Sequence, residues 1–328
     1  MSVLVTGADG YVGSIVLKIL QENGIETKSC DCGWFRHARV DAPLAPPVHF
    51  ADFRLLKAAD LDGVSAIIHL AAYSNDPTGW LSPEATFALN HRDAVELGRV
   101  AREAGVRCFV LSSSCSVYGA SDAVVLDEFG ETAPLTPYAQ SKLDAEIGLV
   151  ELQTSDFRVA ILRGATAFGA SPVPRTDLLL NEVCAEAACR RPFTMTSTGE
   201  AWRPFMPVQN FASALVTAAL DGPLHDTDFP VWNIAPPSMQ MTVRDATERA
   251  AAVTGMARPT FVSGAVADKR SYRVVGTRFS EDFPRFQYAD DFEKEIRETV
   301  VAFAAIPTLV ADLANARFVR LAAIRDVA

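Results

Sequence analysis

The sequence predicts an α/β fold, in which a doubly wound (Rossmann) parallel sheet is followed by a smaller mixed α/β C-terminal lobe. Two observations support this prediction. In the first half, short and almost continuously apolar runs alternate with helical stretches, as expected for parallel strands covered on both faces. After about residue 165 the alternation stops, and Pro and Gly become frequent. We therefore expect one domain over residues 1–165 and a second over residues 166–328.

The first domain is predicted as strands and helices in alternation. Apolar, β-branched runs predict the strands, and the longer stretches between them predict helices. The expected strands are Ser2–Thr6, Glu26–Cys30, Ala66–Leu70, Cys108–Ser112 and Arg158–Leu162. The expected helices are Tyr11–Asn23, Pro83–Gly105 and Pro137–Thr154.

The second domain shows helical patterns but no repeat of the first. The expected helices are Thr176–Arg190, Val208–Leu220, Thr242–Thr254 and Asp290–Phe303. Part of the region 208–234 is a candidate to return to the large sheet. The last stretch, Thr308–Ala328, has apolar residues at helical spacing and either caps the second lobe or packs on a partner chain.

Composition argues against several classes of function. The chain has 328 residues and a net charge of −10, which argues against sequence-independent binding to nucleic acid. It has no apolar run long enough to span a membrane, and its first residues lack the features of a signal peptide. Its six cysteines match no zinc-ligand spacing. We therefore expect no metal site, reduced thiols and a cytoplasmic location.

A glycine-rich turn between the first strand and the first helix predicts a site for a dinucleotide. Gly7, Gly10 and Gly13 stand in the pattern G-x-x-G-x-x-G, with Tyr11 and Val12 between the last two. Gly7 permits a tight turn, Gly10 lets backbone N–H groups approach a diphosphate, and Gly13 lets the helix lie close to the sheet. The N-terminus of the helix then favours the phosphate charge.

An acidic residue at the end of the second strand favours NAD as the cofactor. The carboxylate of Asp31 is placed to accept hydrogen bonds from the adenosine ribose and to repel a 2′-phosphate. Arg36 and Arg39 follow closely and leave NADP as the less favoured alternative. Asp52 is predicted either to contact the adenine or to cap a helix over 54–59. The remaining expected cofactor contacts lie beside Asp52 or at the ends of later strands, and are Phe53, Leu70, Ala71, Ala72 and Ser112.

Tyr138 and Lys142 predict the proton-transfer group. They stand four positions apart and share one face of a helix. A free tyrosine has a pKa near ~10, so it needs a nearby positive charge to act as a base at neutral pH. We expect Lys142 to supply that charge and to hold the nicotinamide ribose, while Ser114 polarises the substrate oxygen. The predicted chemistry is hydride transfer at a carbon that bears a hydroxyl group.

These motifs resemble the extended short-chain dehydrogenase/reductase family, and its nucleotide-sugar epimerase/dehydratase branch fits best. The resemblance is carried by TGADGYVG, by HLAA at 69–72, by SSSCSVYG at 112–119 and by YAQSK, and it spans essentially the whole chain. LRGATAFG at 162–169 and WRPFMPV at 202–208 are similar to motifs of the substrate lobe.

The resemblance implies a nucleoside-diphosphate sugar bound between the lobes. It implies catalytic roles for Ser114, Tyr138 and Lys142, and a homodimer formed through the helices near 83–105 and 137–154. The residues expected at the substrate are Ser74, Asn75, Ser114, Cys115, Ser116, Thr166, Asn181, Arg203 and Arg270. The loop that holds Ser74 and Asn75 has a second interpretation as a plain turn.

The sequence departs from the family at the positions that matter for dehydration. Family 4,6-dehydratases carry an Asp-Glu pair after the catalytic hydroxyl residue, whereas this chain has Cys115 and Ser116. Cys115 is predicted to be a buried small residue rather than a reactive thiol. A family arginine on the nucleotide side is replaced by Ala265, and Arg270 or Arg273 is expected to substitute for it.

The predicted function is therefore NAD-dependent epimerisation of a nucleoside-diphosphate sugar through a 4-keto intermediate. The principal alternative is reduction of a 4-keto nucleotide sugar, or another sugar modification such as dehydration or decarboxylation. A remote alternative is a non-catalytic NAD(P)-binding regulator.

Overall fold

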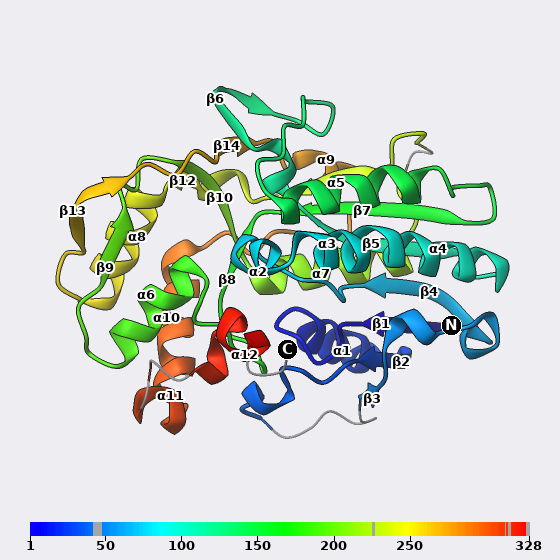
Figure 1. Cartoon of the computed structure of the whole chain (residues 1–328), viewed down its shortest axis with the longest axis horizontal. Helices are drawn as coiled ribbons and strands as arrows, with labels where there is room; N and C mark the ends of the chain where they lie inside the picture. The colour runs from blue at the N-terminus through cyan, green and yellow to red at the C-terminus, as the bar shows by residue number, and fades with distance from the viewer. Residues whose placement is uncertain (42–47, 225–226, 312, 314–315, 326–328) are drawn as a thin grey trace.

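Seven parallel strands form the main sheet (Figure 1). The computed structural model describes residues 1–41, 48–224, 227–311, 313 and 316–325. The strand order is β11-β7-β5-β4-β1-β2-β3, so the chain reverses its direction of travel across the sheet between β1 and β4. Ligands of open α/β sheets bind at such a reversal, beyond the carboxyl ends of the strands. The bounds are β1 Ser2–Thr6, β2 Glu26–Asp31, β3 His49–Phe50, β4 Val64–His69, β5 Cys108–Ser114, β7 Arg158–Gly164 and β11 Val231–Ile234.

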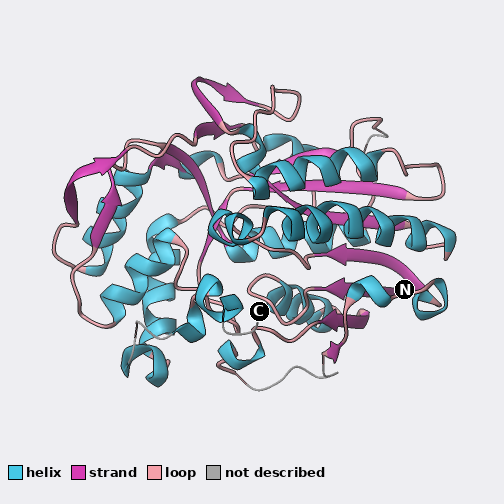
Figure 2. Ribbon diagram, in the orientation of Figure 1, coloured by secondary structure: helices cyan, strands magenta, loops and turns pink. Residues whose placement is uncertain are grey.

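Helices cover both faces of this sheet (Figure 2). The pair α1 (Gly13–Glu22) and α7 (Val208–Leu220) packs on one face, and the pair α4 (Asp93–Glu103) and α5 (Pro137–Val150) packs on the other. Each face has its own apolar core, which explains why strands such as β5 are apolar at successive positions rather than alternate ones. The predicted doubly wound sheet is confirmed.

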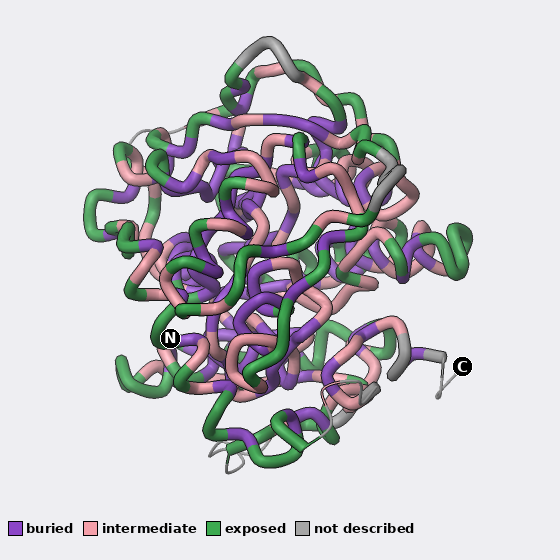
Figure 3. The backbone as a smooth tube through the Cα atoms, turned by 90° about the vertical axis from the view of Figure 1, so that its left-hand side faces the viewer, coloured by how far each residue is buried: buried purple, intermediate pink, exposed green. Residues whose placement is uncertain are grey.

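The second lobe is built on helices around a separate apolar core. These helices are α6 (Leu179–Ala188), α8 (Val243–Thr254) and α10 (Phe292–Ala304). Three short sheets accompany them, with bounds β8 Thr166–Phe168, β10 Trp202–Pro207 and β12 Gln240–Thr242, then β9 Thr194–Ser197 with β13 Thr260–Val266, and β14 Ser271–Val274 with β6 Ala120–Leu126. Figure 3 shows buried segments running through the body of the molecule and exposed loops around it.

The region 208–234 belongs physically to the main sheet. Strand β11 pairs in parallel with β7, and α7 packs against β4, β5 and β7. The chain therefore enters the second lobe after β7, returns to the sheet with α7 and β11, and leaves again.

Two features of the fold differ from the sequence prediction. The expected helix over Pro83–Gly105 is interrupted, since α3 (Pro83–Phe87) is followed by a π-helical turn over Ala88–Arg92 before α4 begins. The short strands of the second lobe were not predicted, because they are brief and one of them, β10, contains two prolines.

The C-terminal stretch folds back toward the main sheet. It forms α11 (Pro307–Ala311), a 3₁₀ turn (Ala316–Phe318) and α12 (Arg320–Arg325), and residues 326–328 lie outside the described residues. Helix α12 contacts α2 (Asp76–Leu81) and lies beside the loop that precedes α1 (Figure 1). Within the described ranges, no helix is both long and apolar enough to cross a lipid bilayer.

Candidate active site

The glycine-rich turn is packed so tightly that side chains are excluded from it. Gly7 has φ +70°, and a Cβ atom on it would lie 2.7 Å from the backbone nitrogen of Ala71. A Cβ atom on Gly13 would lie 2.1 Å from the carbonyl oxygen of Gly7. The turn therefore presents bare backbone at the start of α1, as a diphosphate site requires.

One pocket of about 320 Å³ adjoins this turn, a volume within the range of small-molecule sites. Every predicted cofactor residue except Tyr138 and Lys142 lines it. Its walls come from the carboxyl ends of β1, β2, β4 and β5, together with Trp34, Arg175 and α12. The predicted residues that meet there are Gly7, Gly10, Tyr11, Val12, Gly13, Asp31, Asp52, Phe53, Leu70, Ala71, Ala72 and Ser112.

Asp31 is held in place by backbone donors. The N–H groups of Asp9 and Gly33 donate to its two carboxylate oxygens at 2.9 and 2.7 Å. Burial raises the pKa of Asp31, and these two backbone hydrogen bonds oppose that shift. Arg39 pairs with Asp9 at 2.5 Å and with Asp41 at 2.8 Å, so its guanidinium is already neutralised. This arrangement favours a ribose diol over a 2′-phosphate beside Asp31.

Asp52 caps a 3₁₀ turn, and its contact with the adenine stays a prediction. Its carboxylate accepts the backbone N–H of Arg54 at 3.0 Å and starts the 3₁₀ turn Phe53–Leu55. It also pairs with the Arg54 guanidinium at 2.5 Å. The capping interpretation is correct, although the predicted helix over 54–59 is replaced by two 3₁₀ turns, Phe53–Leu55 and Ala58–Leu61.

Tyr138 lies in the first turn of α5, where Thr136 caps the helix and Pro137 begins it. Helix α2 approaches closely, since a Cβ atom on Gly79 would lie 3.1 Å from the Cβ atom of Tyr138. The pKa of Tyr138 is raised to about 12, chiefly by burial and also by Asp76, while a hydrogen bond with Ser114 opposes the shift. The predicted arrangement of hydroxyl and phenol is therefore present at the end of β5.

Lys142 follows Tyr138 by one turn of α5 and is buried. Its ammonium group donates to the carbonyl oxygen of Ser112 at 2.8 Å. Burial lowers the pKa of Lys142 to about 8, and Glu146 opposes that shift. Its expected roles at the phenol and at the nicotinamide ribose stay predictions.

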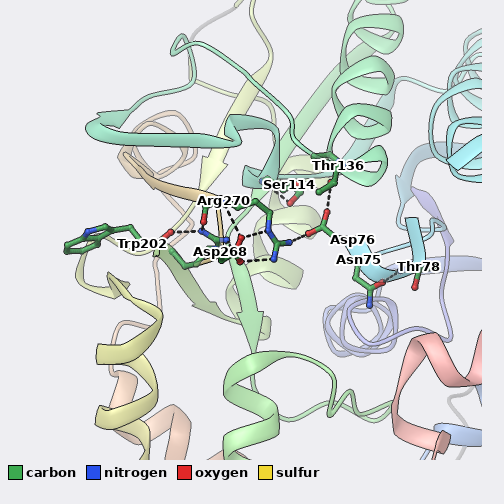
Figure 4. Close-up of polar contacts among 11 residues, drawn as sticks. Asn75, Asp76, Thr78, Ser114, Thr136, Trp202, Asp268 and Arg270 are labelled. Carbon is green, nitrogen blue, oxygen red and sulfur yellow. Dashed lines mark hydrogen bonds and ion pairs between the residues drawn. The ribbon is translucent and has the colours of Figure 1, made fainter. Parts of the chain in front are cut away.

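A network of charges closes the substrate side of the site (Figure 4). Asp76, at the start of α2, accepts a hydrogen bond from Thr136 at 2.5 Å and pairs with Arg270. Arg270 also pairs with Asp268 at 2.7 Å, and Arg203 pairs with the same carboxylate at 2.9 Å. The two arginines predicted at the substrate, Arg203 and Arg270, therefore share the carboxylate of Asp268, and both are already engaged in ion pairs.

Other predicted substrate residues are placed less favourably. Cys115 is fully buried and donates to the carbonyl oxygen of Arg163 at 3.2 Å, and burial raises the pKa of its thiol. It is therefore a structural residue rather than a substrate contact or a reactive thiol. Asn181 is also fully buried, with its amide bonded to Tyr11, Gly169 and Arg175. The remaining ones, Ser74, Asn75, Ser116 and Thr166, are partly or fully accessible, and their substrate contacts stay predictions.

Asn75 caps α2 through the N–H of Thr78 at 2.9 Å, so the turn interpretation of this loop is correct for Asn75.

The sequence analysis did not predict a role for Asn90, which lies in the π-helical turn. Its amide bonds both backbone groups of Tyr73, at 2.9 and 3.0 Å, and the hydroxyl of Ser141 at 3.1 Å. It therefore ties the loop after β4 to α5, and no local motif marks it. Arg175 and Arg320, in the pocket wall, were missed for the same reason.

Comparison with known proteins identifies a family for the chain. A family model described as the NAD-dependent epimerase/dehydratase family matches residues 3–235. The chain is 30% identical over 237 residues to a UDP-glucose 4-epimerase of Azospirillum brasilense, which covers 66% of this chain and 68% of that protein. It is 28% identical to an uncharacterized UDP-glucose epimerase of Bacillus subtilis, over 68% of this chain and 73% of that protein.

Solved structures share the fold. MoeE5 in complex with UDP-glucuronic acid and NAD superposes with a TM-score of 0.78 at 24% identity, over 92% of this chain and 98% of that one. A UDP-glucuronic acid 4-epimerase from Bacillus cereus, in complex with UDP-glucuronic acid and NAD, gives 0.76 at 18% identity over 92% and 99%.

Proposed function

Because the chain belongs to the NAD-dependent epimerase/dehydratase family, we propose that it epimerises a nucleoside-diphosphate sugar at C4 through a 4-keto intermediate. The observation that supports this choice most is the hydrogen bond between Tyr138 and Ser114 at the end of β5, with the buried Cys115 where the resemblance places a carboxylic acid in a dehydratase. Epimerisation needs no further acid or base.

The pocket fits NAD. The bare backbone at Gly7 and Gly13 leaves room for a diphosphate, and the Asp31 carboxylate lines the pocket where a ribose diol would lie. The residues that would hold the cofactor are the pocket residues named above, with Lys142 at the nicotinamide ribose. When bound, NAD would supply the acceptor, and afterwards the donor, of the hydride at the sugar carbon.

The chain's own residues manage the proton. Ser114 would donate a hydrogen bond to the C4 oxygen of the sugar. The Tyr138 side chain, as the phenolate, would accept the proton of that hydroxyl, and the resulting phenol would later return it. Burial raises the pKa of the phenol, so nearby positive charge would be needed to favour the phenolate. Lys142 would contribute part of that charge, and the bound oxidised cofactor would add to it.

Arg203 and Arg270 would hold the diphosphate of the substrate. Both lie in the second lobe and now pair with carboxylates, Arg203 with Asp268 and Arg270 with Asp268 and Asp76. Asp76 in turn accepts a hydrogen bond from Thr136, which caps the helix that carries Tyr138. A diphosphate would replace those carboxylates as a bidentate acceptor. Since several relatives are named UDP-glucose 4-epimerases, uridine diphosphate hexoses are the first substrates to test.

The test is incubation of the purified protein with UDP-glucose or UDP-galactose without added cofactor, followed by chromatographic separation of the two sugars. We expect interconversion, and a loss of about 10²- to 10⁴-fold in Tyr138→Phe with NAD binding retained. A requirement for stoichiometric reduced cofactor would contradict epimerisation and favour the 4-keto reductase. Unchanged turnover in Tyr138→Phe would remove the phenol from the mechanism.

We further propose a homodimer through α4 and α5, where the apolar side chain of Ile147 is 56% exposed. The cytoplasmic location stays a prediction.

A further inference from the structure

Arg320, in the first turn of α12, is a buried cation whose two terminal nitrogens have no hydrogen-bond partner among the described residues. Its side chain is 2% exposed, and neither terminal guanidinium nitrogen bonds to any described residue. Burying such a group without a partner is costly. The pKa of Arg320 is lowered to about 9, chiefly by burial and also by the positive charge of Arg175. A bound anion that accepts hydrogen bonds from the guanidinium would offset this cost.

The guanidinium lies in the wall of the cofactor pocket. Arg320 and Ile324 line it together with Gly10, Tyr11 and Asp31. The side chain is stacked over the ring of Phe35, with 3.9 Å between the guanidinium carbon and the ring centroid. This stacking leaves the edge of the guanidinium, which carries its N–H donors, available to a ligand.

Neighbouring charges leave Arg320 as the available donor. Arg175 lines the same pocket, but it is bonded twice to Asp177, both at 2.9 Å. Asp31 and Asp9 influence Arg320 electrostatically, yet their carboxylates bond to backbone groups or to Arg39. In this part of the described chain, Arg320 alone combines burial in the pocket wall with unused donors.

We propose that Arg320 binds the diphosphate of the dinucleotide cofactor, and that the segment Ala316–Arg325 thereby closes the cofactor pocket. This proposal rests on the cofactor class of the proposed function. Asp31 serves the adenosine ribose, and Tyr138 and Lys142 serve the nicotinamide end, so the diphosphate between them is the anionic part of the ligand. The glycine-rich turn offers it only neutral backbone donors, whereas a guanidinium offers a bidentate, charged pair.

The test is the affinity of the full chain for NAD, NADP, ADP and adenosine, measured by calorimetry after removal of co-purified nucleotide. In Arg320→Gln we expect NAD and ADP to bind about 10- to 100-fold more weakly, since the loss of hydrogen bonds to a charged group weakens binding by about this factor. Adenosine, which lacks phosphate, should bind as it does to the wild type. Arg320→Lys should recover part of the loss.

Arg317→Gln is the matched control. Arg317 lies on the same segment and donates to the carbonyl oxygen of Arg39 at 3.0 Å, but it does not line the pocket. It should leave the ratio of NAD to adenosine affinity unchanged. The proposal fails if Arg320→Gln binds NAD like the wild type, or if adenosine affinity falls equally. A loss confined to NADP would assign the guanidinium to a 2′-phosphate and overturn it.

These outcomes are independent of turnover. A wild-type protein that binds NAD but epimerises no sugar would contradict the proposed function and leave the assignment of Arg320 intact.

Discussion

Lys142 and Tyr138 show how burial sets the chemistry of single residues. Lys142 is 3% exposed, and its ammonium group has one carbonyl partner, that of Ser112. Its pKa is lowered to about 8, while that of Tyr138 is raised to about 12. Both shifts favour the neutral form, so the site is costly to charge until ligands supply compensating groups. A functional lysine placed in this way should reduce stability.

Replacement of Lys142 tests this cost. Below about pH 8 the ammonium is protonated in the folded and unfolded protein, so its burial penalty is fully present. As the pH rises from about 8 to the ordinary 10.5, only the unfolded chain still binds the proton, and the penalty disappears. We expect Lys142→Met to be more stable than the wild type at pH 7 by about 1–3 kcal/mol. The gain should shrink toward zero near pH 10.5.

Urea denaturation at several pH values measures this difference, and Lys18→Met, on the exposed side of α1, gives the baseline for loss of a lysine. A gain that does not depend on pH would mean that packing, not charge, is responsible.

At the scale of elements, a buried ion pair fixes α5 on the sheet. Arg163 of β7 donates to Glu146 of α5 at 2.7 Å, and each side chain is 4% exposed. Ser113 of β5 donates to the same carboxylate, and Tyr118 accepts from Arg163 at 2.9 Å. Glu146 lies one turn beyond Lys142, so this network sets the position of the helix face that carries Lys142 and Tyr138.

Breaking this pair should be strongly destabilising. Arg163→Met leaves the Glu146 carboxylate buried without its cation, and we expect a loss of about 3–5 kcal/mol in the free energy of unfolding. The double variant Glu146→Gln/Arg163→Met should lose less than the sum of the single variants, since no charge is then stranded. Denaturant titration measures both. Arg258→Met breaks a pair on a 79% exposed arginine and should cost less than about 1 kcal/mol; an equal cost at both sites would contradict this account.

The elements that could be predicted from sequence are those with an uninterrupted pattern. The five expected strands and helix α7 lie where apolar runs indicated, because burial on both faces leaves a continuous signal. The glycine-rich turn and Asp31 were predictable because backbone geometry restricts the residue type. Other features depend on partners distant in the chain, so the local spacing of residues does not indicate them. These are the π-helical turn with Asn90 and the short strands of the second lobe.

At the scale of the whole molecule, the site is assembled from segments far apart in the sequence. Asp76 meets Arg270, and Arg320 of the C-terminal helix lines a pocket that begins at Gly7. The sequence indicated helical spacing at 308–328, but not that this segment would return to the cofactor pocket. The position of this segment depends on its packing against residues distant in the sequence, and no sequence motif indicates such packing.

The outer surface of α4 and α5 supports the proposed homodimer. These helices pack closely, since a Cβ atom on Gly148 would lie 2.7 Å from the side chain of Val95 and one on Gly98 would lie 2.6 Å from Leu149. Ile147 of α5 nevertheless remains 56% exposed. An apolar side chain on a flat, rigid helix pair is suited to a two-fold interface, in which each copy contributes the same patch.

Ile147→Glu should therefore separate the subunits. Burial of an isoleucine contributes about 1.5–3 kcal/mol, and two-fold symmetry places the substitution twice in the interface. Together with the cost of burying two carboxylates, we expect the dimer dissociation constant to rise by more than about 10²-fold. Sedimentation velocity over a range of concentrations measures it. Val301→Glu, at a 70% exposed position on α10, adds the same charge elsewhere and should leave the dimer intact. A wild-type monomer, or a dimer unaffected by Ile147→Glu, would place the assembly surface on another face, because a buried charge at the centre of a two-fold contact cannot be tolerated.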